Sequence, residues 1–600
     1  MESGPKGDGS LHISATPTAN TQPFRPADFA TLTEALDYAA QGDTGCNFFN
    51  GRGRIYDRLT YRELREQSQE LARQLLGLGL AKGDRVALVA ETDAHFVRFF
   101  YACHYAGLIP VALPASVKIG AHEAYVAQLH RLLEASDADV AVASEGYLGF
   151  LEEASEGLSV RMVATPEAFY ALDVPAIDLP AVDAGDIAYL QYTSGSTRFP
   201  RGVIIRHQTA MANLHGIVAH GLNITGKDRL MSWLPFYHDM GLVGFVLTPV
   251  AAQISVDYLD TREFAMRPRQ WLKMMTQSKA TIAFAPSFGY DLCARRVRPG
   301  DIAEYDLSHW RVAGIGAEMI RPQTLEHFAD ILEPAGFDRR AFVACYGMAE
   351  CTLGVSFSPL SEGFSTHYID SDHLADQHEA VLMDRGETEG RGRHFVNCGV
   401  PLPSFEVEVR DEDGNALPDW KSGVIHLRGP SVMSGYFNLP EETAHALCGD
   451  GWLNTGDIGY LADGVLTITG RKKDLIIIHG RNIWPQDLEH LAETQPEVRV
   501  GDALAFSAPD HEGEEMCVLV VQCRERDPNK RHGLVRRLTA IVRTELGLDC
   551  YVELVPPHSL PRTSSGKLSR AKARLDFIAA HDEERLNAVA EELRVRVATA

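Results

Sequence analysis

A stretch rich in hydroxyl groups, YTSGSTRFPRGV, offers the kind of groups that hold phosphate. Its backbone N–H groups and hydroxyls can point at phosphate oxygens, and its glycine permits close approach. Two arginines in the same stretch, Arg198 and Arg201, can clamp an anion, although they could equally pin the loop to neighbouring carboxylates. An ordinary polar hairpin is the alternative for the whole stretch. The residues expected to contact phosphate are Thr193, Ser194, Gly195, Ser196 and Thr197.

Other nucleotide and metal motifs are excluded by the sequence. The stretch GLNITGKD nearly fits the phosphate-loop pattern, but Asp228 replaces the metal-binding hydroxyl, so we interpret it as a turn after a helix. No G-x-G-x-x-G opens a helix after a strand, which leaves dinucleotide redox chemistry with little support. The ten cysteines are scattered, without a C-x-x-C pair, and are expected to be reduced core thiols.

Seven motifs in a fixed order decide between these interpretations. The motifs are YTSGSTRFPRG, WLPFYHDMGLVG, GIGAE, YGMAE, GWLNTGD, GRKKDLIIIHGRNIWPQDLE and PRTSSGKLSR. Together they resemble the acyl-adenylate-forming ligase superfamily, which holds acyl-CoA synthetases, peptide-synthetase adenylation domains and luciferases. The resemblance covers about residues 31–578 and implies ATP and magnesium as cofactors.

Finer features are similar to one subgroup, the fatty acyl-AMP ligases. Arg198 and Arg201 stand where most of the superfamily has glycine and lysine, and APSFGYDLCARR also fits the subgroup. A long segment between Cys351 and Cys398 matches the insertion that separates these ligases from acyl-CoA synthetases, although a plain surface loop is the alternative. The resemblance implies that ATP and a fatty acid give acyl-AMP, and that the acyl group then moves to a carrier protein's phosphopantetheine thiol.

Catalytic roles follow by resemblance. Adenylation brings two anions together, so the site needs cations, oriented donors and a metal. Lys567 is expected to bridge carboxylate and phosphate, and to act only when its mobile lobe closes. Glu350 is expected to coordinate magnesium together with Thr193, since magnesium takes few protein carboxylates. His238 lies where the family has a gate between nucleotide and acyl sites, whereas a lone histidine is more often structural.

The nucleotide is expected to meet a second group of residues. Asp457 offers two acceptor oxygens to the ribose hydroxyls, with Arg471 helping, and a turn-capping aspartate is the alternative. Tyr346 is expected against adenine, although an aromatic residue at a strand end is often core. The remaining residues expected to line the nucleotide site are Gly316, Ala317, Glu318, Gly347 and Met348.

Two further roles concern the acyl chain and the hinge. Lys473 falls where the superfamily swings its small lobe, so its side chain need not touch substrate. The insertion is expected to limit that swing and so disfavour coenzyme A. Apolar side chains suit an alkyl chain, and each could equally be simple core. The expected acyl pocket consists of Phe236, Met240, Phe288 and Tyr290.

The elements that must position these residues form an α/β protein. Helical patterns alternate with short apolar runs such as RVALVA, LIPVAL and ATIAFA, which predicts largely parallel sheets. Beyond Val396 short strands separated by turns predict a small β-barrel-like subdomain. We expect a disordered tail over 1–26, an adenylate-forming domain over 27–470 and a small mobile α+β lobe over 471–600.

Composition limits the classes of partner that the protein is expected to bind. A net charge of −24 argues against nucleic acid, and no apolar run or signal peptide predicts membrane insertion, so a cytoplasmic protein is expected. No carrier signature follows the lobe, so a separate carrier protein is expected to accept the acyl group. The basic stretch KRHGLVRRL could dock an acidic carrier or simply be a solvated face.

Three rival functions remain open at this stage. The nearest is a medium- or long-chain acyl-CoA synthetase, which differs only in the acceptor. A non-catalytic sensor that keeps the fold is the second, and the retention of Lys567, Asp457 and Glu350 together argues against it. A luciferase-like oxygenase is the third.

Overall fold

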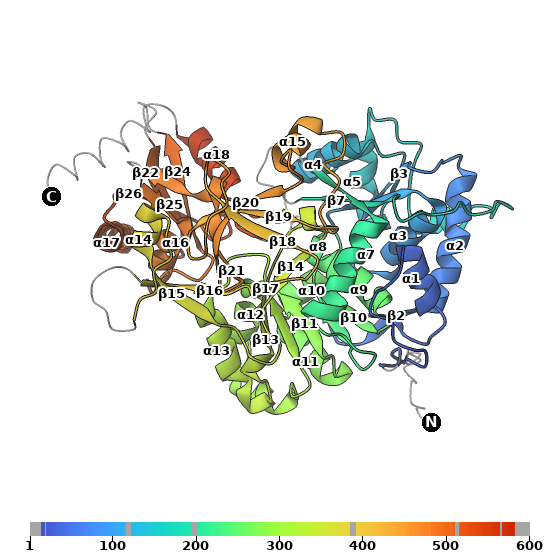
Figure 1. Cartoon of the computed structure of the whole chain (residues 1–600), viewed down its shortest axis with the longest axis horizontal. Coiled ribbons are helices and arrows are strands. Elements are labelled where there is room, and N and C mark those ends of the chain that lie inside the picture. Colours follow the sequence, from blue (N-terminus) through green and yellow to red (C-terminus); the bar gives the residue numbers. More distant parts are fainter. Residues whose placement is uncertain are drawn as a thin grey trace, which may run out of the picture.

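The computed structural model describes residues 14–18, 20–115, 122–193, 201–384, 392–478, 481–509, 515–563 and 567–581, and all statements below concern these residues. The protein has mixed α/β architecture, as the sequence predicts, with two large sheets, a smaller antiparallel sheet and a C-terminal lobe (Figure 1). Among the described helices, none is long and apolar enough to cross a lipid bilayer.

The first large sheet has six strands in the order β6-β5-β3-β4-β7-β8, parallel except for the β7–β8 pair. Helices α2 to α6 connect or cover these strands. The strands are β3 (Arg85–Val89), β4 (Ile109–Leu113), β5 (Val140–Val142), β6 (Met162–Ala164), β7 (Ile187–Tyr192) and β8 (Gly202–Arg206). The helices are α2 (Tyr61–Gly77), α3 (Ala94–Ala106), α4 (His122–Ser136), α5 (Glu145–Ser155) and α6 (Pro166–Tyr170).

The second large sheet has nine strands in the order β17-β14-β13-β12-β11-β9-β10-β1-β2, and its six central strands are parallel. Its strands are β1 (Gly45–Phe49), β2 (Ile55–Thr60), β9 (Leu230–Ser232), β10 (Val256–Leu259), β11 (Ile282–Ala285), β12 (Val312–Ile315), β13 (Phe342–Gly347), β14 (Gly354–Phe357) and β17 (Val400–Pro401).

Helices between these strands include two π-helical segments, η1 (Gly216–Gly221) and η2 (Leu242–Leu247), which flank β9 along the chain. Such segments are rare and often occur at functional sites. The α-helices are α1 (Leu32–Ala39), α7 (His207–His215), α8 (Asp239–Gly241), α9 (Thr248–Ala251), α10 (Thr261–Met266), α11 (Arg269–Ser278), α12 (Ser287–Ala294) and α13 (Pro322–Leu332).

Beyond the second sheet the chain becomes β-rich, as the sequence predicts. A four-stranded antiparallel sheet forms, and the segment between Cys351 and Cys398 adds a two-stranded hairpin with one helix. The four strands are β18 (Glu406–Arg410), β19 (Gly423–Arg428), β20 (Leu453–Ala462) and β21 (Val465–Arg471), with α15 (Pro440–Ala446) before β20. The hairpin consists of β15 (Thr366–Asp370), α14 (Ser371–Gln377) and β16 (Gly392–Val396).

The C-terminal lobe, defined here as the described part of residues 476–581, has hydrophobic clusters of its own, separate from the large cluster that extends to Leu466. Its helices cover a three-stranded sheet in which β25 and β26 are parallel. The elements are β22 (Ile476–Ile478), β23 (Arg481–Ile483), α16 (Pro485–Glu493), β24 (Ala503–Pro509), β25 (Glu515–Gln522), α17 (Pro528–Leu546), β26 (Cys550–Val555) and α18 (Arg570–Ala580).

Local sequence explains where the helices begin and end. Thr60 accepts a hydrogen bond from the backbone of Glu63, whose side chain returns to Thr60, so a capping box starts α2. Asp93 caps α3, and Gly107 ends it in the left-handed conformation at φ 67°. The two helices are thereby fixed against the first sheet, whose strand ends carry part of the site.

Part of the tail expected to be disordered is ordered. Thr16 is buried, its N–H donates to the side chain of Asn47 at 2.9 Å, and its carbonyl accepts from Arg229 at 2.9 Å. These bonds satisfy polar groups of the second sheet that would otherwise lack partners. Residues 1–13 lie outside the described part of the chain.

Arg229 and Asp257 form a buried ion pair under this tail. Two guanidinium nitrogens contact the two carboxylate oxygens at 2.8 and 2.6 Å, and the side chains are 3% and 0% exposed. Asn47 donates to the same carboxylate at 2.8 Å. Because every partner is satisfied, the pair is tolerated in the interior, but loss of one member leaves an uncompensated charge.

The variant Arg229→Ala is therefore expected to lose about 3–5 kcal/mol of stability, seen as a lower midpoint in thermal unfolding. Arg340→Ala is the matched control, because its pair with Asp338 is exposed and such pairs contribute about 0–1 kcal/mol. Equal midpoints for the two variants would contradict the assignment of Arg229 as a structural anchor.

Candidate active site

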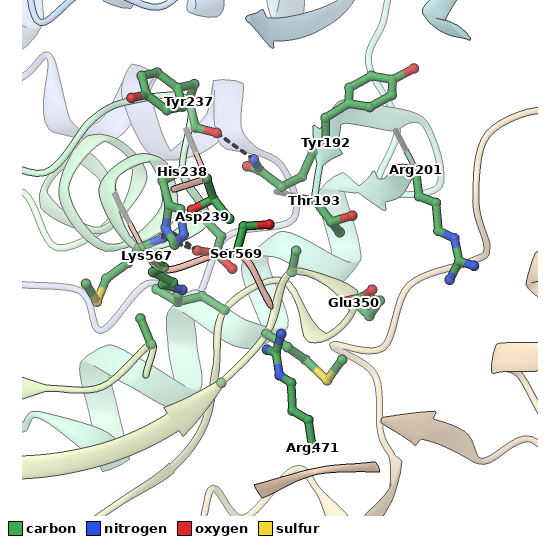
Figure 2. A pocket seen from close by; sticks show the side chains of 18 of the residues that line it. Tyr192, Thr193, Arg201, Tyr237, His238, Asp239, Glu350, Arg471, Lys567 and Ser569 are labelled. Atoms are coloured by element: carbon green, nitrogen blue, oxygen red, sulfur yellow. Dashed lines mark hydrogen bonds and ion pairs between the residues drawn. The ribbon is translucent and has the colours of Figure 1, made fainter. Parts of the chain in front are cut away.

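A cavity of about 1350 Å³ opens where the carboxyl ends of strands from both large sheets meet the C-terminal lobe. Ligands of open α/β sheets bind at this edge, because loops and helix starts converge there. Residues of β7, β13, the β20–β21 pair and the segment before α18 all line it. Figure 2 shows His238, Asp239 and Lys567 together on one side, with Glu350 across the open space and Arg201 beyond it.

The phosphate-binding stretch enters the cavity at its first residue. Thr193 lines the cavity directly after β7, and its N–H donates to the carbonyl of Arg201 at 3.1 Å, which brings both ends of the loop together. Arg201 also lines the cavity, with its guanidinium 5.3 Å from the ring centre of Tyr436. The predicted phosphate contacts Ser194, Gly195, Ser196 and Thr197, and Arg198, lie outside the described residues.

A charged cluster lies at the expected meeting point of the two substrates. His238 Nδ1 contacts Asp239 Oδ1 at 2.6 Å, and the N–H of Met240 donates to the same oxygen at 2.7 Å. Burial disfavours ionisation of Asp239, but His238 and then Lys567 lower the pKa of its carboxyl to about 2. Asp239 is therefore a fixed negative charge, which sequence inspection did not select.

Lys567 reaches this cluster from the C-terminal lobe. The carbonyl of Lys567 accepts from the N–H of Thr563 at 2.8 Å. Burial lowers the pKa of the Lys567 ammonium, and the charge of Asp239 opposes that shift. The predicted reacting cation thus lies in the same cavity as His238.

A second polar group lies on the side expected to hold the nucleotide. The Tyr346 hydroxyl donates to Asp457 Oδ2 at 2.6 Å, and Arg471 Nε donates to Oδ1 at 3.1 Å. Asp457 and Arg471 are register partners in β20 and β21, so the antiparallel pairing places them together. All three line the cavity, and the hydrogen-bonding groups that a ribose would need are held by strands.

The predicted backbone edge for the base follows β12 and β13. Ala317 lines the cavity at φ 69°, and a side chain at Gly316 would come within 2.8 Å of Cys345. At Gly347 a Cβ would be 2.0 Å from the carbonyl oxygen of Leu353, so this position accepts only glycine. Met348 lines the cavity. Glu318 instead accepts the N–H of Phe288 at 3.2 Å and is absent from the described lining.

Glu350 is held next to the phosphate-binding stretch by a residue that the sequence did not indicate. The Tyr436 hydroxyl donates to Glu350 Oε1 at 2.8 Å, and Arg201 lies over the ring of Tyr436. Burial raises the pKa of Glu350, and the bond from Tyr436 opposes the rise. Glu350 and Thr193 line the same cavity, and a carboxylate with a hydroxyl is a donor set that suits magnesium, which keeps most of its waters. No cluster of three or more acidic, histidine or cysteine ligands occurs among the described residues.

The four residues predicted for the acyl pocket lie in different surroundings, and their role stays a prediction. Met240 lines the cavity, but the other three residues do not. The Phe236 ring is buried 4.9 Å from that of Tyr258, the Tyr290 hydroxyl donates to the carbonyl of Gly314 at 2.9 Å, and Phe288 packs against Trp233. Phe236 and Tyr290 are fully buried, where they remove more apolar surface from water than a cavity wall allows, and Phe288 is partly buried against the same core.

The apolar part of the cavity is instead built by the π-helical segments and the face of the second sheet. We call it the apolar arm. The two π-helical segments have the sequences GIVAHG and LVGFVL, and they come before and after β9 along the chain. Its side chains are Ile217, Leu222, Leu230, Phe245, Ile282, Phe284, Leu353 and Phe357.

Lys473, the predicted hinge residue, also lines the cavity. Burial lowers the pKa of its ammonium. The adjacent Asp474 contacts Arg570 at 3.4 Å, and Arg570 contacts Glu489 at 2.8 Å, so the segment after β21 is tied to α16 and α18. The hinge role itself stays a prediction.

The hairpin between Cys351 and Cys398 is not a free surface loop. Figure 1 shows its strands and α14 beside the C-terminal lobe. Ile369, Leu374 and Phe395 share a hydrophobic cluster with Trp484 of the lobe. Arg393 of β16 forms an ion pair with Asp487 of α16 at 2.6 Å. Arg321, directly before α13, forms a second ion pair with the same helix, to Glu493 at 2.5 Å.

Comparison with known proteins agrees with this geometry. A family model described as AMP-binding enzyme matches residues 39–437. A putative acyl-CoA synthetase of Caulobacter vibrioides is 46% identical over 573 residues, covering 94% of this chain and 98% of the relative. A medium-chain-fatty-acid–[acyl-carrier-protein] ligase of Moorena producens is 31% identical, covering 92% of this chain and 95% of the relative.

A solved structure of similar sequence also has the same fold. A structure from work on fatty acyl-adenylate ligases of E. coli and L. pneumophila superposes with a TM-score of 0.87 at 46% identity, covering 93% of this chain and 99% of that chain.

Gly347 gives a test of the nucleotide side. Gly347→Ala is expected to weaken AMP binding at least about tenfold, roughly 1.4 kcal/mol, because the added methyl group must displace the backbone of Leu353 and the turn that carries Glu350. Calorimetric titration with AMP measures this. Gly449→Ala is the control, since its Cβ would meet nothing within 4 Å, and an unchanged affinity in Gly347→Ala would refute the placement.

Proposed function

The chain belongs to the AMP-binding enzyme family, and from that premise we propose that it activates a fatty acid to acyl-AMP and passes the acyl group to a carrier protein. Enzymes of this family use ATP. The observation that carries the proposal is Lys567, which reaches from the C-terminal lobe into the cavity that also holds Asp457 and Glu350. A cation, a ribose acceptor and a metal ligand around one space match the needs of adenylation.

The reaction forms one bond and breaks one. A carboxylate oxygen of the fatty acid attacks the α-phosphorus of ATP, the new C–O–P bond forms, and the bond from the α-phosphorus to the bridging oxygen breaks with its electron pair. Pyrophosphate leaves, and no proton transfer is needed. The site must therefore neutralise negative charge that accumulates between carboxylate and phosphate.

Lys567 supplies that positive charge. Its ammonium is desolvated, which strengthens its attraction for two anions compared with a lysine in water. The charge of Asp239 opposes the fall in the pKa of that ammonium, and so favours its charged form. His238, fixed by Asp239, borders both the charged cluster and the entrance to the apolar arm at Met240. The pair thus orients the carboxylate toward Lys567.

The nucleotide is held by the Tyr346–Asp457–Arg471 group. Ribose hydroxyls can donate to the Asp457 oxygens, which accept from Tyr346 and Arg471 in this structure. Glu350 and Thr193 would hold magnesium, which when bound screens the charge of the phosphates. Tyr436 orients Glu350 for that contact, and Arg201 stacks on Tyr436. Arg201 therefore supports the metal ligand as well as facing the cavity.

The choice of acceptor depends on the C-terminal lobe. The lobe is tied to the hairpin through Arg393 and Trp484, and to the body through Arg321. We infer that these contacts favour the adenylating arrangement and oppose the rotation that coenzyme A requires. We keep the domain boundary at residue 470 as part of this proposal. The acyl-CoA synthetase reading, favoured by the name of the Caulobacter relative, is the second candidate.

The basic stretch on α17 is not proposed as the carrier-docking surface. Arg537 pairs with Glu497 at 2.6 Å, Arg531 donates to the carbonyl of Leu554 at 2.9 Å, and Lys530 contacts Glu525 at 3.4 Å. Three of its cations thus have partners within the lobe. The carrier's binding surface is left open.

A paired assay tests the function. Purified protein with ATP, magnesium and labelled dodecanoate is expected to accumulate acyl-AMP, to ignore coenzyme A and to load a holo carrier protein. Lys567→Ala is expected to lose acyl-AMP formation at least about a hundredfold, because the reacting charge is removed. Prompt formation of acyl-CoA would favour the synthetase reading, and absence of any adenylate would refute both.

The two ion pairs that hold α16, Arg393–Asp487 and Arg321–Glu493, are called the latch here and can be tested separately. Arg393→Ala combined with Arg321→Ala is expected to release α16 and to produce measurable acyl-CoA, while acyl-AMP formation persists. Arg339→Ala is the control, because its pair with Asp330 is exposed and far from the lobe in sequence. Deletion of residues 366–391 is the stronger form of the same experiment. No gain of acyl-CoA in either variant would contradict the latch.

A further inference from the structure

The apolar arm runs away from the charged cluster, down the face of the second sheet. Leu230 and Ile282 are the first residues of β9 and β11 and are register partners, whereas Phe284 lies two residues later in β11. A strand rises about 3.3 Å per residue, so the Leu230–Ile282 level lies roughly 7 Å below Phe284. Since His238 follows the carboxyl end of β9, these two residues lie at the deep end of the arm.

Leu222 completes that deep end. It follows η1, and its N–H donates to the carbonyl of Ile217 at 2.8 Å, five residues back, as in a π-turn. Both side chains line the cavity, and Leu222 is only 4% exposed. The turn Gly221–Asp228, whose sequence resembles a phosphate loop, therefore contributes an apolar wall.

A polar seal lies directly behind Leu222. Arg311 donates from Nη1 to the carbonyl of Leu222 at 3.0 Å and from Nε to Asp228 at 2.7 Å. Asp228 also accepts from Thr281 Oγ1 at 2.7 Å and from the N–H of Thr225 at 2.8 Å. These carboxylate oxygens are already satisfied, so the seal offers little to a polar group on a ligand.

We propose that Leu222, held in place by the Arg311–Asp228 pair, is the end stop of the apolar arm and sets the length of the alkyl chain that the protein accepts. The proposal rests on the proposed function, since it takes the arm to hold a fatty acid. An alkyl chain can fill the arm until its methyl end meets Leu222, and a longer chain would have to break the ion pair behind it. The favoured substrates are linear acids with an apolar end.

The direct test is Leu222→Ala. The variant is expected to shift the optimum in a series of saturated acids, from hexanoate to octadecanoate, toward longer chains, with kcat/KM for the longest acids rising about tenfold. A tenfold rise corresponds to about 1.4 kcal/mol, which is the gain expected when two more carbons of the chain are buried. Leu214→Ala is the matched control, because Leu214 is a buried leucine of α7 that does not line the cavity.

A second variant keeps the proposal testable if Leu222→Ala is unstable. Leu222→Phe adds volume at the same place and is expected to shift the optimum toward shorter acids. Arg311→Lys tests the positioning role: it removes the bidentate bond to Asp228 and is expected to broaden the chain-length profile while leaving KM for ATP unchanged. Thermal midpoints are measured for all variants.

Binding is measured beside turnover, by displacement of a fluorescent fatty acid. A profile that shifts in Leu222 variants but not in Leu214→Ala supports the end stop. Identical profiles in wild type and all variants overturn it, whereas acyl-AMP formation still supports the proposed function. If no acid is adenylated, the proposed function fails, and the displacement profiles alone decide on Leu222. Equal binding of dodecanoate and 12-hydroxydodecanoate would also overturn the apolar end.

Discussion

The arrangement of the site depends on one electrostatic interaction, between the Lys567 ammonium of the C-terminal lobe and the Asp239 carboxylate that lines the same cavity. An isolated ion in this position would be costly, because burial removes the water that stabilises its charge. Asp239 supplies the compensation, and His238 keeps Asp239 ionised. The charged cluster is therefore complete only when the C-terminal lobe lies against the body.

This requirement explains why so many contacts hold the lobe from outside the cavity. Arg321 and Arg393 reach α16 from two directions, and Trp484 inserts into the hydrophobic cluster of the hairpin. Glu493 is 4% exposed, so its pairing with Arg321 is screened little by solvent. Contacts of this kind favour one arrangement of a two-state element and disfavour the other. In the proposed function, they favour the arrangement in which Lys567 lies in the cavity.

The sequence predicted the α/β fold and its strand rhythm well, because each buried strand is a short apolar run between helical patterns. It also indicated polar residues that the fold brings together, such as Tyr346, Asp457 and Arg471, which lie in motifs far apart in the chain. It did not single out Asp239, although that residue lies in the motif WLPFYHDMGLVG, nor Tyr436, which lies outside the seven motifs. It selected Phe236 and Tyr290 for the acyl pocket because they are large and apolar, but such rings pack best inside a core.

The residues that do form the apolar arm could not be found by size, because their role comes from backbone geometry. The π-helical segments on both sides of β9 alter which side chains face the sheet, and a helical period of 3.6 residues does not describe them. The turn after η1 was interpreted only as a connection, yet Asp228 accepts from Arg311 of a distant segment and so fixes the carbonyl of Leu222. An ion pair at the far end of an apolar channel acts on substrate length without touching substrate, since it keeps the apolar wall from yielding. Under the proposed end-stop role of Leu222, the contacts that join Arg311 and Thr281 to Asp228 would therefore also limit the length of the acyl chain.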